Sequence, residues 1–463
     1  MGTDRRWITA YATFAVFTLL AGQFWRNLLG WWGFGIVAGL VLIGAVVLLV
    51  QVRPKWIWRR VPKSTLVFVL LATLSIAWSF YPGASALGVA ITLATTLTAV
   101  SLVLCLSWTQ FVRRLGAALK WVLGLSLAFE LWVAIFVGGP VLPNFPDFEV
   151  TGEQLPMAFY WSRGLLFDGG PIEGIVANRN LLGMIALLAL IVFGARLAAG
   201  SVRRFPGIAW IVVAGGVMAL TRSATVLLVG VIVVVAFAFA LWARRVGPDR
   251  RARVYWTAAA SLAASVALVA VFWGRLLGAL GKSEDLTGRF DIWNSVIGLA
   301  AERPWFGWGW VGYWVPWVEP FDDLAVRKGV TYLQAHNAWL DVWMQLGVIG
   351  LLAFASIVIG ALWRSWFLAV DRPMDAAGQP LPHSAAAFVP LLLVVALIGQ
   401  SLAESRILVE SGWMLLIAVA WSTKWRQWEH EPLPADPVPL PARVALPAPA
   451  DGTTRPFDTL DER

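Results

Sequence analysis

One histidine stands where an apolar helix is expected to begin. His336 lies in the stretch QAHNAWLDVWMQLGVIG, and the chain has only three histidines in 463 residues. A histidine whose pKa lies near neutrality can accept a proton from a hydroxyl group, or it can hold a phosphate as a cation. The alternative is that His336 is an ordinary side chain at the membrane–water interface, without a chemical role. The surrounding motifs have to show which of these interpretations fits.

Three arginines lie in short polar motifs between apolar stretches. Arg179 lies in VANRNL, Arg222 in ALTRSA and Arg289 in LTGRFDIW. A guanidinium group keeps its charge and binds phosphate oxygens through two parallel hydrogen bonds, so converging arginines suit a phosphate site. Asn180 and Ser223, which follow the first two arginines, are polar residues suited to the same site. Single arginines at a membrane surface also anchor lipid headgroups, because their aliphatic stems snorkel.

Two glutamates are candidates for holding these cations. Glu130, in SLAFELW, lies inside an apolar run, where a carboxylate is functional or paired by default. We expect it to pair with a site arginine, with a structural polar contact as an equal alternative. Glu404, in QSLAESR, lies at the end of an apolar run and is suited to orient His336 or an arginine, or to pair with Arg406. The sequence has no zinc-ligand spacing and no phosphate-cradling glycine loop, so we expect no metal and no cofactor.

The composition shows what must position these residues. Hydrophobic residues make up 59% of the chain, charged residues make up 14%, and the mean hydropathy is +0.73. A soluble domain carries about 25% charged residues, so we predict an all-α integral membrane protein. In a membrane protein the net charge of +9 indicates which loops face the cytoplasm, and it does not indicate a nucleic-acid-binding surface. We expect membrane lipids among its partners, and no nucleic acid.

The hydropathy pattern predicts about twelve transmembrane helices, at about 20 residues per span. They lie near 7–24, 28–51, 65–81, 85–106, 119–138, 175–195, 207–221, 224–243, 254–273, 338–362, 386–403 and 407–423. With both termini in the cytoplasm, every short loop that holds a basic cluster falls on the inner side, as the positive-inside rule requires. Arg179, Arg222, Arg289 and His336 then fall on the outer side.

Two long segments, 139–174 and 274–337, are external loops in this topology, the larger one between spans nine and ten. Loops of this length are usually functional or disordered, and the aromatic run WFGWGWVGYWVPW argues against disorder. We expect the run to roof an outer cavity or, equally, to lie on the bilayer as a re-entrant segment. The chain divides into a polytopic membrane domain over 1–428 and a disordered, Pro- and Ala-rich cytoplasmic tail over 429–463.

An ordered set of motifs resembles those of a known family. The chain contains, in this order, ANRNLLG, LTRSAT, TGRFDIW, ERPWFGWGW, QAHNAWLDVWMQLGVIG and SLAES. Together they resemble the O-antigen ligase and polysaccharide polymerase superfamily, whose multispan enzymes use polyprenyl-linked glycans. The resemblance is strongest over 175–423, and the first five spans are similar only in hydropathy. Its implied catalytic residues are Arg222, Arg289 and His336, with Arg179 close to the Asn-rich start of the sixth span.

The resemblance implies an inverting, metal-independent glycosyltransferase on the outer, periplasmic side of the bacterial cytoplasmic membrane. Its donor would be a glycan on undecaprenyl pyrophosphate, and its acceptor a hydroxyl group of a glycan, a lipid or a wall polymer. The residue types fit this chemistry, because arginines stabilise charge that grows on a pyrophosphate leaving group. A histidine that deprotonates the acceptor contributes roughly 10²–10⁴-fold. Base and phosphate ligand are both open roles for His336, and both ligase and polymerase are open activities.

The remaining candidates are assigned to substrate binding: Arg179, Asn180, Ser223, Asn337, Glu404 and Glu130. Asn337 is also expected to cap the helix that begins after it. The alternative function is a twelve-span transporter or flippase of lipid-linked glycans. A transporter is expected to place polar or broken-helix features near mid-membrane with repeat symmetry, whereas this chain collects its outer charges beside one large external loop. The sequence therefore favours an enzyme of cell-surface or exopolysaccharide biosynthesis.

Overall fold

The computed structural model describes residues 5–146, 155–279, 284–327, 330–374 and 377–427. Over these ranges the chain is a bundle of α-helices with one antiparallel ribbon, in which β1 (Val326–Arg327) pairs with β2 (Val330–Thr331). The predicted helical fold class is confirmed for this part of the chain. The predicted cytoplasmic tail over 429–463 lies outside the described residues.

Every one of the twelve predicted spans falls on a helix. The helices are α1 (Arg5–Leu20), α2 (Gly22–Val52), α3 (Lys63–Leu74), α4 (Pro82–Cys105), α5 (Trp108–Trp132), α6 (Arg179–Ala198), α7 (Arg204–Leu220), α8 (Ala224–Val246), α9 (Arg251–Ala279), α10 (Glu284–Glu302), α11 (Ala338–Val370), α12 (Phe388–Ser401) and α13 (Glu410–Arg426). By length and composition, seven of the described helices can cross a membrane, namely α2, α4, α5, α6, α8, α9 and α11. Four shorter apolar helices are α1, α3, α7 and α12. The number of spans and the orientation of the termini stay predictions.

Two boundaries differ from those expected. Helix α5 begins well before residue 119, because Ser107 and Gln110 form a capping box at its start. The Ser107 hydroxyl accepts from the Gln110 backbone N–H at 3.3 Å, and the Gln110 side chain accepts from the Ser107 N–H at 2.9 Å. The segment 274–337 is not a loop throughout, since it contains α10 and the β1–β2 ribbon.

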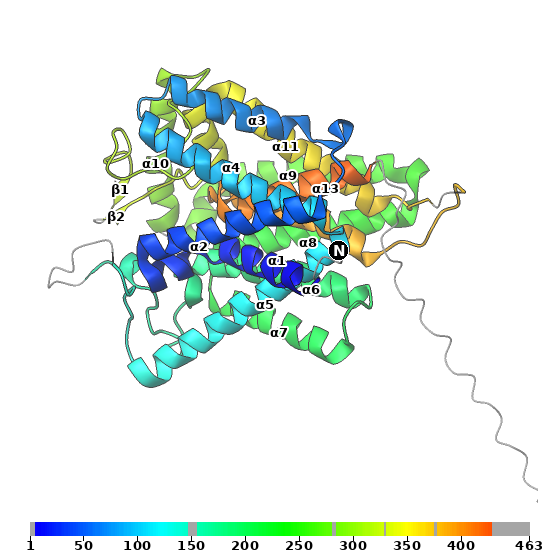
Figure 1. Ribbon diagram of the computed structural model, residues 1–463, viewed down its shortest axis with the longest axis horizontal. Helices are drawn as coiled ribbons and strands as arrows, with labels where there is room; N and C mark the ends of the chain where they lie inside the picture. Colours follow the sequence, from blue (N-terminus) through cyan, green and yellow to red (C-terminus); the bar gives the residue numbers. More distant parts are fainter. Residues whose placement is uncertain (1–4, 147–154, 280–283, 328–329, 375–376, 428–463) are drawn as a thin grey trace, which may run out of the picture.

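The bundle has a buried interior and an apolar exterior. Helix α13 is buried from Ser411 to Thr423, and α12 is almost as enclosed. Helices α2 and α8 instead expose large apolar side chains, such as Ile36 and Val234. Extensive exposed apolar surface marks a membrane or partner interface, which agrees with a multi-pass membrane protein. Figure 1 shows α10 and the β1–β2 ribbon at one end of the bundle and the start of α1 toward the other.

A break in α11 fixes the large loop to the bundle. At Gly347 the backbone turns to a φ of 65° inside the helix. The loop inserts its own backbone there, with Trp308 N–H donating to the Met344 carbonyl (3.0 Å) and Val348 N–H donating to the Pro304 carbonyl (2.8 Å). Backbone groups that leave a helix at membrane depth must find partners in the protein. The loop supplies them, so the break and the loop stabilise each other.

The aromatic run is largely a structural element. Trp310 is fully buried, and its indole N–H donates to Thr92 Oγ1 at 2.9 Å. Trp314 is also buried and donates to Asp341 Oδ1 at 2.8 Å, whereas Trp317 is exposed. A buried indole needs a partner for its N–H, and both find one in the bundle. The middle of the run therefore belongs to the core of the bundle. It neither roofs an outer cavity nor lies on the bilayer as a re-entrant segment.

We expect Gly347→Ala to destabilise the protein strongly. An alanine Cβ would lie 2.1 Å from the carbonyl carbon of Trp305, and the left-handed φ adds about 1–3 kcal/mol of backbone strain. The thermal midpoint of the detergent-purified protein, followed by loss of the monodisperse elution peak, should fall by several degrees. The control is Gly216→Ala in α7, where an added Cβ meets no atom within 4 Å. Equal midpoints for the two variants would contradict the role of the break.

Candidate active site

The carboxylate of Glu404, in the turn between α12 and α13, is the centre of a buried polar network. Its side chain is 9% exposed. Oε1 accepts hydrogen bonds from Asn180 Nδ2 (3.2 Å) and Arg289 Nη2 (3.3 Å). Oε2 accepts from Gln334 Nε2 (3.0 Å) and pairs with His336 Nδ1 (2.9 Å). We call these five residues the Glu404 network; it joins the start of α6, helix α10, the segment before α11 and the turn between α12 and α13, which are far apart in the sequence.

Three helices that start at this network begin with the same backbone turn. The residue before each N-cap has a left-handed φ, of 52° at Ala177, 49° at Arg222 and 51° at His336. The N-caps accept backbone N–H groups of the first turn of α6, α8 and α11; they are Asn178, Ser223 and Asn337. A left-handed φ is uncommon in residues other than glycine and clusters at functional sites. The positive ends of three helix dipoles therefore add to the potential around the network.

Arg222 is placed at the network as an accessible cation. Its neighbour Ser223 donates from Oγ to Asn180 Oδ1 at 2.7 Å, which links the start of α8 to Glu404 through one side chain. Arg222 itself is exposed. None of the carboxylates that the structure describes forms an ion pair with it. Its guanidinium group lies close to Gly169, where an added Cβ would be 3.4 Å from Nη2. Arg222 is thus positioned by its backbone and keeps its charge available.

The contact with Glu404 fixes which ring nitrogen of His336 points to the carboxylate. Burial alone would raise the pKa of the Glu404 carboxyl, but His336 and Arg289 outweigh burial and hold that pKa below its usual value. An ionised carboxylate can only accept hydrogen bonds. His336 must therefore donate from Nδ1–H, which in the neutral ring leaves the lone pair on Nε2. Arg406, the other partner considered for Glu404, forms its ion pair with Glu410 at 2.5 Å.

A second polar cluster lies beside the network, between the end of α5 and the start of α6. Glu130 is buried and accepts from Ser162 Oγ (2.8 Å) and from the backbone N–H groups of Glu173 (3.0 Å) and Gly174 (2.7 Å). Glu173 pairs with Arg163 at 2.9 Å. The described hydrogen-bond partners of Glu130 are thus a hydroxyl group and two backbone amides. Of the two alternatives, Glu130 makes the structural polar contact and not the expected arginine pair.

The structure brings most of the predicted site residues together. His336, Arg289 and Asn180 contact Glu404 directly, and Ser223 is one hydrogen bond further away. Arg179 is the first residue of α6, next to Asn180 in the chain, and acts electrostatically on Glu173. The predicted cap is confirmed, because the Asn337 side chain accepts from the N–H of Trp339 at 3.0 Å.

Three residues of the site region were missed by the sequence analysis. Gln334 stands two positions before His336 in the same motif, and this proximity is a signal that could have found it. Asp341 is fully buried in α11 and accepts from Trp314, from the Ala335 N–H (3.0 Å) and from the Ser405 hydroxyl. Glu173 has no sequence signal that separates it from other loop carboxylates.

Comparisons with known proteins fall on this region. Residues 207–355 match a family model described as O-antigen ligase, a range that holds Arg222, Arg289 and His336. The chain is also 31% identical over 117 residues to the exopolysaccharide production protein ExoQ of Rhizobium meliloti (strain 1021). That match covers 23% of this chain and 26% of the relative, so the chain spans about a quarter of the curated relative it matches. Asn180 and Glu404 lie outside the family match.

We expect Glu404→Gln to loosen the site. The substitution removes the negative charge that holds Arg289 and His336, and breaking a buried ion pair on one side costs roughly 3–5 kcal/mol. The thermal midpoint of the purified protein should fall clearly below that of the wild type. Glu302→Gln, at the exposed end of α10, should leave it unchanged. A Glu404→Gln protein as stable as the wild type would show that the network is not held by this charge.

We expect Glu173 to make stability depend on pH. Burial, opposed by Arg163, raises the pKa of its carboxyl to about 7, whereas an unfolded glutamate titrates near about 4.3. Between these values the folded protein keeps a proton that the unfolded chain has lost, so stability decreases as the pH rises and levels off above about 7. Thermal midpoints measured across this range should decline less in Glu173→Gln than in the wild type.

The control for this measurement is Asp168→Asn, which changes an exposed carboxylate in the same loop. It should keep the wild-type pH dependence. If Glu173→Gln kept that dependence as well, the carboxyl of Glu173 would not be the group responsible.

Proposed function

We propose that the chain is an inverting glycosyltransferase of polysaccharide biosynthesis, because residues 207–355 match the O-antigen ligase family model and part of the chain is similar to an exopolysaccharide production protein. The donor is a glycan carried on undecaprenyl pyrophosphate. The acceptor is a hydroxyl group of a second glycan, a lipid or a wall polymer. The observation that carries the proposal is the single carboxylate of Glu404, which holds a histidine and an arginine at one site.

The cations of the site suit a pyrophosphate leaving group. As the acceptor oxygen bonds to the anomeric carbon, the bond from that carbon to the pyrophosphate oxygen breaks, and its electron pair stays on the pyrophosphate. Preformed positive charge aimed at this oxygen stabilises the transition state. Arg222 is exposed at the start of α8, Arg289 is held by Glu404, and Arg179 begins α6. The N-termini of α6, α8 and α11 add partial positive charge, as helix N-termini do at phosphate sites. These groups belong to the protein, so the proposed transfer needs no metal ion.

The hydrogen bond from His336 to Glu404 supports a general base. With Nδ1–H donated to the carboxylate, Nε2 carries the lone pair and takes the proton that the acceptor hydroxyl loses. The negative charge of Glu404 then stabilises the imidazolium, as the acidic member does in other carboxylate–histidine pairs. His336 Nδ1 lies 2.9 Å from Glu404 Oε2, which fixes the ring orientation that this transfer needs. We therefore assign His336 the role of base rather than phosphate ligand.

The arrangement of the bundle supports a site on the external face of the cytoplasmic membrane. Arg289 belongs to α10, at the end of the bundle away from the start of α1 (Figure 1). The positive-inside rule puts the start of α1 in the cytoplasm. The polyprenyl tail then stays in the bilayer while the glycan projects outward. Under this proposal Asn180 and Ser223 support the site, and Glu130 shapes the adjoining loop.

We expect glycan transfer to fail when a site arginine or His336 is replaced. The assay mixes detergent-purified protein with a polyprenyl-pyrophosphate glycan and candidate acceptors, with EDTA present, and measures the new glycosidic bond. Arg222→Ala and Arg289→Ala should each lower the rate by about 10²–10³-fold, and His336→Gln by about 10²–10⁴-fold. Arg253→Ala, an exposed arginine at the start of α9, is the matched control and should keep the wild-type rate.

His336→Lys separates the two roles of the histidine. A lysine can hold a phosphate but is a poor base at neutral pH, because it is protonated. As a base, His336 cannot be replaced, and the lysine variant should be as slow as His336→Gln. A fast lysine variant would assign phosphate binding instead. Loss of activity in EDTA would overturn the metal-independent mechanism, and translocation of the glycan without a new bond would overturn the enzyme itself.

A further inference from the structure

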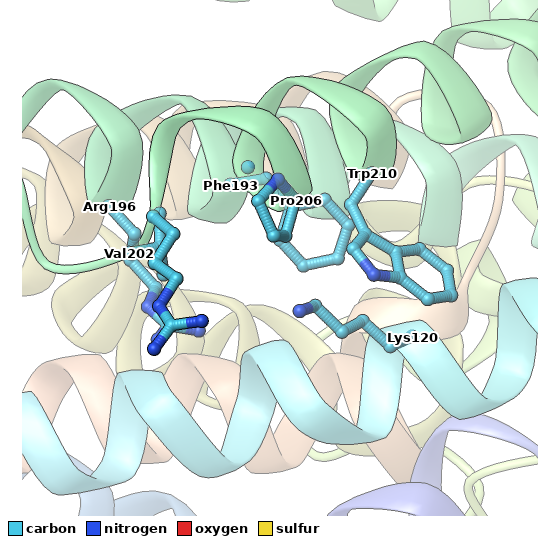
Figure 2. Close-up of a pocket in the computed structure, with 8 residues that line it drawn as sticks. Lys120, Phe193, Arg196, Val202, Pro206 and Trp210 are labelled. Atoms are coloured by element: carbon cyan, nitrogen blue, oxygen red, sulfur yellow. The ribbon is translucent and has the colours of Figure 1, made fainter.

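A basic cavity lies between α5 and the α6–α7 hairpin, away from the Glu404 network. Its volume is about 210 Å³, and Lys120, Arg196 and Arg203 line it together with Phe193 and Trp210. Clefts that hold drug-sized molecules measure roughly 300–1,000 Å³, so this one suits a smaller group. Figure 2 shows the Lys120 side chain reaching from α5 into the space beneath the hairpin, toward Arg196.

The cations of this cavity have no anionic partner among the residues that the structure describes. Lys120 Nζ lies 5.3 Å from the centre of the Trp210 ring and 5.8 Å from that of Phe193. Arg196 is half-buried and lies within electrostatic range of Arg113 and Arg114. No carboxylate in the described part of the chain forms an ion pair with Lys120, Arg196 or Arg203. Aromatic faces attract cations only weakly, and partly buried like charges repel one another. The cluster therefore favours an anion.

The surroundings of the cavity indicate what kind of anion fits. Helix α7 begins beside it and exposes Phe205, Ile208 and Val212, and α5 exposes Trp121 one residue after Lys120. A ligand at this place meets positive charge at one end and an apolar helix face next to it. A free phosphate would use only the charge, whereas a phospholipid would use both. Basic pockets between membrane helices bind the headgroups of anionic lipids in this way.

The position along α6 puts the cavity at the opposite membrane surface. Asn180, at the start of α6, belongs to the Glu404 network, and Arg196 lies in its last turn. At 1.5 Å per residue the two are about 24 Å apart along the helix, comparable to the roughly 30 Å hydrocarbon core of a bilayer. We propose that this cavity binds the phosphate headgroup of an anionic phospholipid in the leaflet opposite the Glu404 network.

Native mass spectrometry of the full-length protein in detergent tests the assignment. Phosphatidylglycerol, phosphatidylcholine and inorganic phosphate are added in separate titrations. Phosphatidylglycerol should remain bound to the wild type, whereas phosphatidylcholine and inorganic phosphate at the same concentrations should not. Each of Lys120→Gln, Arg196→Gln and Arg203→Gln should weaken retention by about fivefold, the effect of one basic residue near an anionic lipid.

One control variant and one fallback variant complete the binding experiment. Arg250→Gln changes an exposed arginine before α9 and should retain phosphatidylglycerol like the wild type. Arg203 is exposed, so Arg203→Gln carries the test if the half-buried Arg196 cannot be replaced without unfolding. Equal retention of phosphatidylcholine, or equal retention by the cavity variants and Arg250→Gln, would overturn the proposal. Binding of inorganic phosphate that displaces phosphatidylglycerol would identify a free-phosphate site instead.

Discussion

The arrangement of the site depends on one buried negative charge, the carboxylate of Glu404. An ionised carboxylate away from water is stable only when its lone pairs are occupied, and here the donors come from Asn180, Arg289, Gln334 and His336. The start of α6, helix α10 and the segment before α11 therefore depend on one another for their positions. The same contacts hold an imidazole and a guanidinium group at one site, where the proposed chemistry needs them.

Asp341 supports this arrangement from inside α11. It is fully buried and accepts from the indole of Trp314, the backbone N–H of Ala335 and the hydroxyl of Ser405. Glu404 binds the side chains of Gln334 and His336, and Asp341 binds the backbone of Ala335 between them. The two carboxylates therefore hold the segment before α11 from two sides. Together with the break at Gly347, they hold the long segment between α9 and α11 in place, because each satisfies backbone or indole donors that would otherwise be unpaired.

The helices were predictable because each had only to be apolar over a sufficient length. Every predicted span falls on a helix, and the cap at Asn337 follows from its residue type and place. Helix α10 was not predicted, since its sequence lies in a polar segment without a long apolar run. The burial of Trp310 and Trp314 was not predictable either, because tryptophan is also common at the membrane–water interface. Their partners, Thr92 and Asp341, come from distant helices.

The sequence by itself determined which residues were able to do chemistry, because charge, acidity and hydrogen-bonding capacity belong to the side chain. His336, Arg222 and Arg289 were predicted as candidates from their types and motifs, and their catalytic role stays a prediction. Only the tertiary structure decided which side chains meet, because Glu404 lies 68 residues from His336 and 224 from Asn180 along the chain. Glu130 shows the converse: its type suggested an arginine partner, and the fold gave it the Ser162 hydroxyl and backbone amides instead. Partner choice follows from how helices pack, and no local pattern encodes that.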